Sequence, residues 1–223
     1  MREARSPRRP TGKPQQPAPG GVAAAQKVAR HAAQEVRIIG GLWKRTPLAV
    51  PVAAGLRPTP SRVRETLFNW LGQDLSGWTV LDAFAGSGAL GLEAASRGAQ
   101  AVTLIERDAA LVKAIRASVD KLQATQVTVQ AGEAIAWMQQ AAQLGRAFDL
   151  VFLDPPFDDN LFEKAVEAGR GCVPEGGWIY VEAPHALAFG PEAGLRLARQ
   201  GQAGAVHFHL FQRMGDPAQA PKP

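Results

Sequence analysis

From residue 61 onward, two patterns of hydrophobic positions alternate along the chain. Short continuous apolar runs, typical of buried strands, follow stretches whose apolar residues recur every three to four positions, as in an amphipathic helix. This alternation predicts an α/β fold, a parallel sheet covered by helices on both faces. The last segment, Ala205–Arg213, alternates as an edge strand does. The other expected strands and helices, in chain order, are Thr79–Asp82, Leu90–Arg97, Val102–Glu106, Ala109–Leu122, Val127–Gln130, Ala134–Ala142, Phe148–Leu153, Leu161–Gly169 and Trp178–Glu182.

A further helix is expected ahead of the first strand. Apolar residues recur at helical spacing between Ser61, a candidate amino-terminal cap, and Gly72, a candidate stop. The helix should bury its apolar face and expose Arg62 and Glu65.

The first predicted strand ends in a glycine-rich turn that reads Asp-Ala-Phe-Ala-Gly-Ser-Gly over residues 82–88. Gly86 and Gly88 lack a Cβ, so the backbone can turn tightly and a ligand can approach the amino terminus of the next helix. Asp82 would repel the pyrophosphate of a dinucleotide but attract a cation. The next strand ends in Glu106, where nucleotide-binding α/β domains place an acid for ribose hydroxyls.

Together these features favour a cationic adenosine cofactor without phosphates, and S-adenosylmethionine fits. Its ammonium group can face Asp82, its carboxylate the amides of the glycine loop and its ribose Glu106. Taken alone, Glu106 is equally consistent with a solvated acid at the end of a strand.

Asp154-Pro155-Pro156-Phe157 follows the apolar run Phe148–Leu153, at the carboxyl edge where open α/β sheets bind ligands. Asp154 and the carbonyl of Pro155 could accept both hydrogens of an exocyclic amine, while Phe157 stacks on the ring. An isolated Asp-Pro-Pro triplet would more often be a simple turn. The upstream glycine loop favours the functional interpretation.

The order of five motifs resembles a bacterial family that methylates the exocyclic N2 amine of one guanine in small-subunit ribosomal RNA. The motifs are RxIGGxW at 37–43, RPT at 57–59, VRExLFNWL at 63–71, DxFAGSGALGLEA at 82–94 and DPPF at 154–157. The resemblance covers roughly residues 36 to 213. It implies a Rossmann-like seven-stranded methyltransferase sheet whose final hairpin is antiparallel. The chain departs from many relatives at Ser61, where an Asp is expected, so a cap or RNA contact there stays open.

The resemblance also implies the residues of the site. Glu133 would lie near the adenine and Ala134 would pack on it, although a Glu there is also an ordinary residue for a helix amino terminus. The expected catalytic residues are Asp154, Pro155, Pro156 and Phe157. The expected cofactor-binding residues are Asp82, Phe84, Ala85, Gly86, Ser87, Gly88, Glu106, Arg107, Glu133, Ala134 and Asp154.

Positive charge is concentrated in the first part of the chain. Residues 1–64 hold 13 Lys or Arg against 2 acids, a net +11, whereas residues 65–223 hold 12 against 18, a net −6, so the overall +5 hides a division. The division predicts a polyanion-binding arm on an acidic catalytic body, although residues 1–30 are equally consistent with a solvated tail. The expected RNA-binding residues, with charges facing outward, are Arg37, Trp43, Lys44, Arg45, Arg57, Thr59, Arg62 and Arg64.

Length and composition set the domain organisation. At 223 residues and 46% apolar content the chain can bury one substantial core. We expect a basic disordered tail at 1–35, a single methyltransferase domain at 36–215 with a hairpin-like RNA-binding element at 36–60, and a flexible end at 216–223. No apolar run is long enough to span a membrane, which favours a cytoplasmic protein. The single cysteine, Cys172, and the absence of ligand spacing argue for a packing role and against a metal site.

The function expected from these features is S-adenosylmethionine-dependent methylation of a guanine N2 amine in 16S ribosomal RNA by direct in-line transfer. We expect the substrate to be RNA organised within an assembled or assembling 30S particle, and the enzyme to be a monomer. Two alternatives stay open. Asp-Pro-Pro-Phe also suits an N6-adenine methyltransferase of DNA or RNA, and a non-catalytic RNA-binding ribosome-assembly factor could retain a residual cofactor fold.

Overall fold

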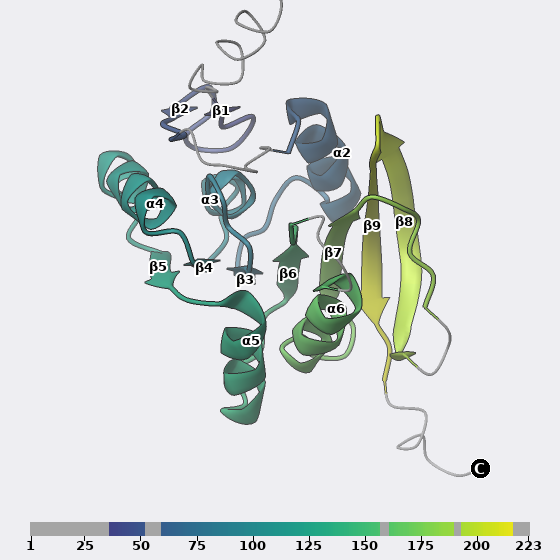
Figure 1. The fold of residues 1–223 in the computed structure, drawn as a ribbon. Helices are drawn as coiled ribbons and strands as arrows, with labels where there is room; N and C mark the ends of the chain where they lie inside the picture. The colour runs from purple at the N-terminus through teal and green to yellow at the C-terminus, as the bar shows by residue number, and fades with distance from the viewer. Residues whose placement is uncertain (1–35, 52–58, 157–160, 190–192, 216–223) are drawn as a thin grey trace, which may run out of the picture. The chain divides into compact units, whose positions relative to one another are not determined.

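The computed structural model describes residues 36–51, 59–156, 161–189 and 193–215. The predicted tail at 1–35 and the predicted flexible end at 216–223 lie outside the described residues, as do Arg57 and Phe157. Helices and strands are named as in Figure 1. Across the described ranges, no helix combines the length and hydropathy needed to cross a membrane.

Seven strands form one sheet in the order β5-β4-β3-β6-β7-β9-β8 (Figure 1). The first five in this order are parallel, whereas β9 runs antiparallel to both β7 and β8. The expected Rossmann-like sheet with an antiparallel final hairpin is therefore confirmed. The strands are β3 (Thr79–Asp82), β4 (Ala101–Glu106), β5 (Val127–Ala131), β6 (Leu150–Leu153), β7 (Trp178–Ala183), β8 (Leu195–Ala203) and β9 (Val206–Arg213).

The prediction of an edge strand at Ala205–Arg213 is wrong. This segment is β9, which pairs on one side with β7 and on the other with β8. On this side of the sheet the edge strand is β8, which the apolar pattern does not reveal. Most of its side chains are exposed, so Leu195–Ala203 lacks the apolar run that marks a buried strand.

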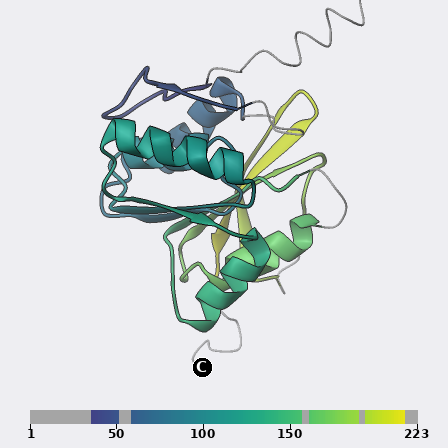
Figure 2. The same ribbon diagram turned by 60° about the vertical axis from the view of Figure 1, so that its left-hand side comes forward.

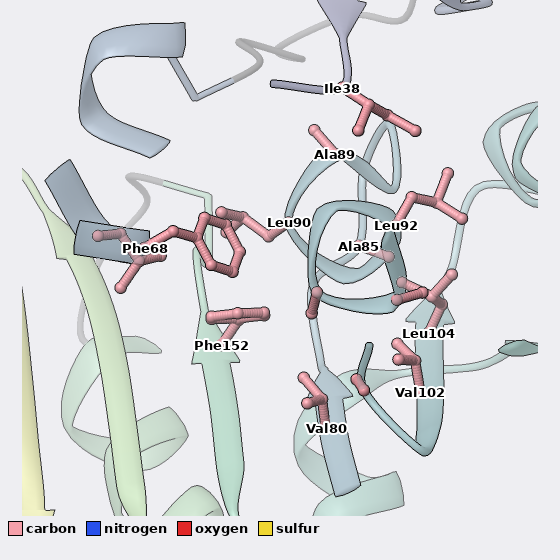
Figure 3. Close-up of a cluster of buried hydrophobic side chains, with 14 of the residues drawn as sticks. Ile38, Phe68, Val80, Ala85, Ala89, Leu90, Leu92, Val102, Leu104 and Phe152 are labelled. Atoms are coloured by element: carbon pink, nitrogen blue, oxygen red, sulfur yellow. The ribbon is translucent and has the colours of Figure 1, made fainter. Parts of the chain in front are cut away.

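Helices cover both faces of the sheet, as expected, with α4 on the opposite face from α5 and α6 (Figure 2). Strand side chains alternate between the faces, so Val80 and Phe152 belong to one hydrophobic cluster while Leu81 and Val151 belong to the other. Phe68 of α2 packs edge to face on Phe152 of β6, with ring centroids 6.2 Å apart (Figure 3). The helices are α2 (Ser61–Leu71), α3 (Ala89–Ser96), α4 (Ala109–Leu122), α5 (Ala134–Gln143) and α6 (Leu161–Gly171).

The two ends of α2 differ in how well the sequence predicts them. Ser61 does not cap the helix as predicted, because Pro60 occupies the cap position and Ser61 is the first helical residue. Its hydroxyl instead accepts a hydrogen bond from Arg64 at 3.3 Å. The stop at Gly72 is confirmed, and its φ of 95° explains why glycine ends the helix.

The segment before α2 contains two short strands, β1 (Val36–Arg37) and β2 (Pro47–Leu48), paired antiparallel. Ile38 lies beside Ala89 of α3 (Figure 3) and belongs to the same buried cluster. Gly41 has a φ of 73°, and a Cβ there would lie 1.8 Å from the carbonyl oxygen of Ser96. This element therefore needs glycine to pack on the end of α3.

Candidate active site

Four acidic residues meet at the carboxyl edge of the parallel strands. Asp82 ends β3, Glu106 ends β4, Asp154 directly follows β6 and Glu182 is the second-last residue of β7. The register pairs Asp82 with Phe152, and Phe152 with Tyr180. With a period of two along each strand, Asp154 and Glu182 follow Phe152 and Tyr180 on the face that Asp82 occupies.

The glycine loop is held to the neighbouring strands on both sides. The amide of Ala83 donates to the carbonyl of Phe152 at 3.1 Å, and the amide of Ala85 donates to that of Ile105 at 2.9 Å. Gly86 and Gly88 adopt φ values of 54° and 76°, which glycine adopts without strain. The predicted tight turn ahead of α3 is confirmed.

Glu106 fixes this loop through its carboxylate. One oxygen accepts the amide of Gly86 at 2.8 Å, and the other accepts the amide of Asp108 at 2.8 Å. Each oxygen keeps a second lone pair that a ribose hydroxyl could approach. Arg107, the next residue along the chain, is exposed.

Asp82 is buried with 2% of its surface exposed, and one of its oxygens accepts the amide of Gly91 at 2.9 Å. Burial raises its pKa to about 7, the amide of Gly91 opposes this shift, and the charges of Glu106 and Glu182 add to it. A Cβ on Gly91 would lie 2.2 Å from a methyl group of Leu104, so only glycine lets α3 approach this closely. The site therefore contains a buried acid whose charged form a positively charged ligand would stabilise.

Glu133 and Ala134 begin α5. The Glu133 side chain caps the helix by accepting the amides of Ile135 at 3.2 Å and Ala136 at 2.8 Å. The alternative interpretation of Glu133 as a helix amino-terminal residue is confirmed, and its contact with an adenine stays a prediction. Ala134 is buried, and Phe84 is half-buried against the same cluster.

Asp154 is half-buried, Pro155 is buried and Pro156 is exposed. Loss of hydration raises the pKa of Asp154 well above its usual value, and the negative charges of Glu182 and Asp82 raise it further.

Glu182 is the acid that the sequence interpretation missed. It is 3% exposed, and the hydroxyl of Tyr180 lies 3.0 Å from one of its carboxylate oxygens. The sequence pattern predicts only a strand over Trp178–Glu182. Two features could have identified Glu182 as a site residue. It lies two residues after Tyr180, and the strand that carries it runs parallel to the strand that leads to Asp154.

Two residues predicted to contact RNA are buried, which corrects their assignment. Thr59 is 7% exposed. Arg64 is 1% exposed, and its guanidinium donates to the carbonyl of Arg37 at 2.9 Å and lies 3.6 Å from the carboxylate of Glu93. Its charge therefore faces inward.

The other predicted RNA contacts keep accessible positions wherever the structure describes them. Arg37, Lys44 and Arg45 in the β1–β2 element and Arg62 on the first turn of α2 are exposed, and Trp43 is half-buried. Their contact with RNA stays a prediction.

Glu93 of α3 joins the β1–β2 element to the site. Its carboxylate is fully buried, accepts the amides of Ile39 and Gly40 at 2.7 Å each, and pairs with Arg97 at 2.8 Å. Arg97 in turn lies over the Phe68 ring, 4.5 Å from its centroid. One acid therefore fixes the β1–β2 element against the helix that begins at the glycine loop.

Among the described residues, no three His, Cys, Asp or Glu side chains are grouped to hold a metal. Cys172 is a buried free cysteine whose thiol lies 3.1 Å from the carbonyl of Met138, in agreement with its predicted packing role. Burial raises the pKa of this thiol to about 11, so it stays protonated near neutral pH.

Three features place the protein in the class of Rossmann-like methyltransferases that use S-adenosylmethionine. They are the sheet order, the glycine loop before α3 and the acids at the ends of β3 and β4. The residues fit that cofactor, because Asp82 offers a buried negative charge, Glu106 offers carboxylate oxygens and the loop approaches closely only through glycines.

Comparison with known proteins identifies the family. A family model described as conserved hypothetical protein 95 matches residues 36–212. The ribosomal RNA small subunit methyltransferase D of Escherichia coli (strain K12) is 42% identical over 183 residues, which cover 80% of this chain and 90% of that protein. The protein of the same name from Haemophilus influenzae is 38% identical, over 80% of this chain and 94% of its own length.

Among solved structures, the Escherichia coli protein yhhF, described provisionally as a methyltransferase, has a TM-score of 0.73 and 39% identity. The match covers 82% of this chain and 100% of that chain. The chain therefore belongs to the conserved hypothetical protein 95 family, which here includes relatives named ribosomal RNA small subunit methyltransferase D.

Proposed function

We propose that this protein methylates the exocyclic N2 amine of a guanine in small-subunit, 16S ribosomal RNA. The observation that carries the proposal is Asp154, a carboxyl at the carboxyl edge of β6 beside the acids of the cofactor site, in a chain 42% identical to a ribosomal RNA small subunit methyltransferase. The family resemblance of the sequence motifs supplies the base and the atom.

When bound, S-adenosylmethionine would supply the methyl group, activated by its sulfonium, for transfer to the N2 amine. The protein's task is to hold nitrogen, carbon and sulfur in line and to exclude water. We propose that Asp82 faces the ammonium group, Glu106 the ribose, and Arg107, Glu133 and Ala134 the adenine end.

Asp154 and the carbonyl of Pro155 would orient the amine by accepting its two hydrogens, and Asp154 would stabilise positive charge as it develops on nitrogen. The target base must leave any stack to reach this edge, at a cost of about a few kcal/mol. Stacking on Phe157 would offset part of that cost.

The proposed partner is small-subunit ribosomal RNA within an assembled or assembling 30S particle, met by a monomeric, cytoplasmic enzyme that needs no metal. Exposed Arg37, Lys44, Arg45 and Arg62 would contact phosphates. Methylation of adenine N6 remains the second candidate, because Asp-Pro-Pro-Phe suits any aromatic amine.

Substitution of Asp154 by Ala tests the catalytic assignment. We expect transfer of radiolabelled methyl to ribosomal RNA to fall below detection, because the group that orients the amine is lost. Binding of S-adenosylmethionine, measured by calorimetry, should stay within about twofold of wild type, since Asp82 and Glu106 remain. Turnover like that of wild type would overturn the role of Asp154.

A further inference from the structure

A groove on the α2 side of the sheet lies apart from the cofactor and catalytic residues. It has a volume of about 280 Å³ and is formed by the last turn of α2, the start of β7 and the β8–β9 hairpin. Its walls include the indoles of Trp70 and Trp178, the side chain of Leu210 and two arginines, Arg196 and Arg199. These residues have no part in the site described above, so the groove requires a separate explanation.

A β-bulge brings the two arginines to the same face of the hairpin. Side chains three residues apart on a regular strand point to opposite faces. The register between β8 and β9 shifts between Leu197 and Arg199. Arg196 aligns with Gln212, and Arg199 aligns with Leu210. These two partners are two residues apart on β9 and share a face, so the two arginines share it as well.

Both arginines are exposed and donate hydrogen bonds to uncharged acceptors. Arg196 donates to the side-chain oxygen of Gln212, and Arg199 donates to the carbonyl of Ala198 at 2.8 Å. A neutral acceptor does not cancel the charge of a guanidinium, and each guanidinium has further N–H donors to offer. Both side chains therefore keep positive charge and donors for an anionic partner.

Trp70 forms a fixed aromatic wall of the groove. Its indole stacks on Phe208 of β9, with ring centroids 5.3 Å apart and planes inclined by 29°, which holds α2 against the hairpin (Figure 1). Trp70 and Trp178 are both half-buried, so part of each indole stays accessible. Aromatic rings beside arginines suit single-stranded nucleic acid, because bases stack on the rings while phosphates bind the guanidinium groups.

Two other partners suit this surface less well. A second copy of the chain would pair along the free edge of β8, where exposed arginines bring like charges together and oppose such pairing. An acidic protein segment could pair with the arginines, but its carboxylates offer the indoles no flat ring on which to stack. A nucleotide offers both a ring and a phosphate.

The groove lies on the same face of the sheet as the β1–β2 element. Trp70 and Trp178 pack on the hydrophobic cluster that also contains Val36 and Leu48. Trp178 begins β7 and Glu182 lies four residues further along, a span of about 13 Å at about 3.3 Å per residue. About four nucleotides of a stacked strand cover that distance. An RNA strand whose target base enters among the acids can therefore extend along this face to the groove.

We propose that this groove binds an unpaired nucleotide of the ribosomal RNA substrate, a few positions along the strand from the target guanine. The base stacks against Trp70 and Trp178, while Arg196 and Arg199 bind the adjoining phosphates. The contact adds affinity with little preference for sequence, because every base has a face that can stack. This inference rests on the proposed function and adds a second RNA surface to that of the β1–β2 element.

The first test removes the two charges of the groove. The full chain carrying Arg196→Ala and Arg199→Ala binds naked 16S ribosomal RNA in a filter assay at several salt concentrations. We expect the slope of log affinity against log salt to fall in magnitude by about 1.4, at about 0.7 for each lost phosphate contact. The matched control carries Arg146→Ala and Lys164→Ala, two exposed positions on or beside the helices of the other face, and should keep the wild-type slope. Equal slopes in the groove variant and wild type would overturn the proposal.

The second test concerns stacking. Trp70→Leu keeps an apolar side chain but removes the ring, so RNA affinity should fall by about tenfold with an unchanged salt slope, because no charge is lost. A single-stranded oligoribonucleotide that carries 5-iodouracil should cross-link to Trp70 or Trp178 on irradiation, as identified by mass spectrometry of the peptides. Cross-links confined to residues outside the groove would contradict the assignment. Should Trp70→Leu not fold in a urea unfolding assay, the cross-link and the arginine variant decide the question.

The outcomes also distinguish this inference from the proposed function. If wild type labels ribosomal RNA while both groove variants match it in affinity and slope, only the groove assignment fails. If wild type labels no ribosomal RNA, the proposed function fails first. An arginine variant that binds naked RNA like wild type but assembled subunits more weakly would assign the groove to a ribosomal protein and overturn the RNA contact. A wild-type dimer in sedimentation that the arginine variant abolishes would assign the groove to a second copy instead.

Discussion

At the scale of single residues, Asp82 combines burial with a position next to the glycine loop. Its pKa of about 7 lies above the ordinary value of an aspartic acid because burial disfavours the charged form. A cationic ligand reverses that balance, since it binds the ionised form better. Asp82 is therefore the residue at which pH should control cofactor affinity.

We predict that wild-type affinity for S-adenosylmethionine rises by about tenfold from pH 6 to pH 8, because Asp82 ionises through a pKa near 7 and only its anion attracts the ammonium group. Asp82→Asn keeps the shape and can still accept the amide of Gly91, so its affinity at pH 8 should fall to near the value at pH 6. Calorimetry at the two pH values measures both. The same rise with pH in the Asn variant would contradict the assignment.

Residue identities in this site were predictable where they lay in ordered motifs. Asp82 and Glu106 each end a strand, and Asp154 directly follows one. The apolar runs of these strands are visible in the sequence, and parallel strands bring their ends together. Thr59 and Arg64 were misplaced because polar and basic side chains are usually exposed. The burial of Arg64 depends on a partner distant in sequence, Glu93, which a local pattern does not specify.

At the scale of elements, α3 carries two functions on one helix. Its amino terminus follows the glycine loop, and its last turns hold the β1–β2 element through Glu93 and Ser96. The hydroxyl of Ser96 donates to the carbonyl of Gly40 at 2.6 Å and accepts the amide of Trp43 at 2.9 Å. The element that presents Lys44 and Arg45 is thus fixed to the helix of the cofactor site.

We predict that Glu93→Ala destabilises the fold by about 3–5 kcal/mol, because it leaves the charges of Arg64 and Arg97 buried without their partner. The amides of Ile39 and Gly40 also lose their acceptor. Urea unfolding followed by circular dichroism measures the change. Glu65→Ala, an exposed substitution on α2, is the control and should change the stability by less than about 0.5 kcal/mol. An equal loss in both variants would contradict the role of Glu93.

The sequence predicts those strands that are buried and those helices that are amphipathic. The parallel strands have apolar runs, and Gly72 ends α2 as predicted. The sequence does not predict β8, because an exposed edge strand contains few apolar residues. Without β8 as a predicted partner, β9 has the pattern of an edge strand. The prediction that Ser61 caps α2 is wrong because Pro60 occupies the cap position. The hydroxyl of Ser61 instead accepts a hydrogen bond from Arg64.

At the scale of the whole molecule, charge is divided between an arginine-rich first part and an acidic remainder, +11 over residues 1–64 and −6 over 65–223. At the sheet edge, Asp82 and Glu182 are buried, whereas Lys44, Arg45 and Arg62 are exposed. A polyanion should therefore be held by the first part while its target base enters among the acids.

We predict that replacing Lys44, Arg45 and Arg62 together by Ala makes the salt dependence of RNA binding less steep. The slope of log affinity against log salt should fall in magnitude by about 2, because each lost phosphate contact to single-stranded RNA accounts for about 0.7. Filter binding to ribosomal RNA at several salt concentrations measures this slope. The control variant replaces three exposed basic residues elsewhere, Lys113, Arg146 and Lys164, and should keep the wild-type slope. Equal slopes in all three proteins would contradict the assigned RNA surface.

The identity of the methylated nucleoside decides whether the protein has the proposed function. Radiolabelled methyl from S-adenosylmethionine is offered to small ribosomal subunits, naked ribosomal RNA and duplex DNA from a strain lacking this enzyme, and the products are digested and separated. We predict labelled N2-methylguanosine from ribosomal material, with assembled subunits preferred over naked RNA. Labelled N6-methyladenine, or no label on any substrate despite measurable cofactor binding, would contradict this prediction.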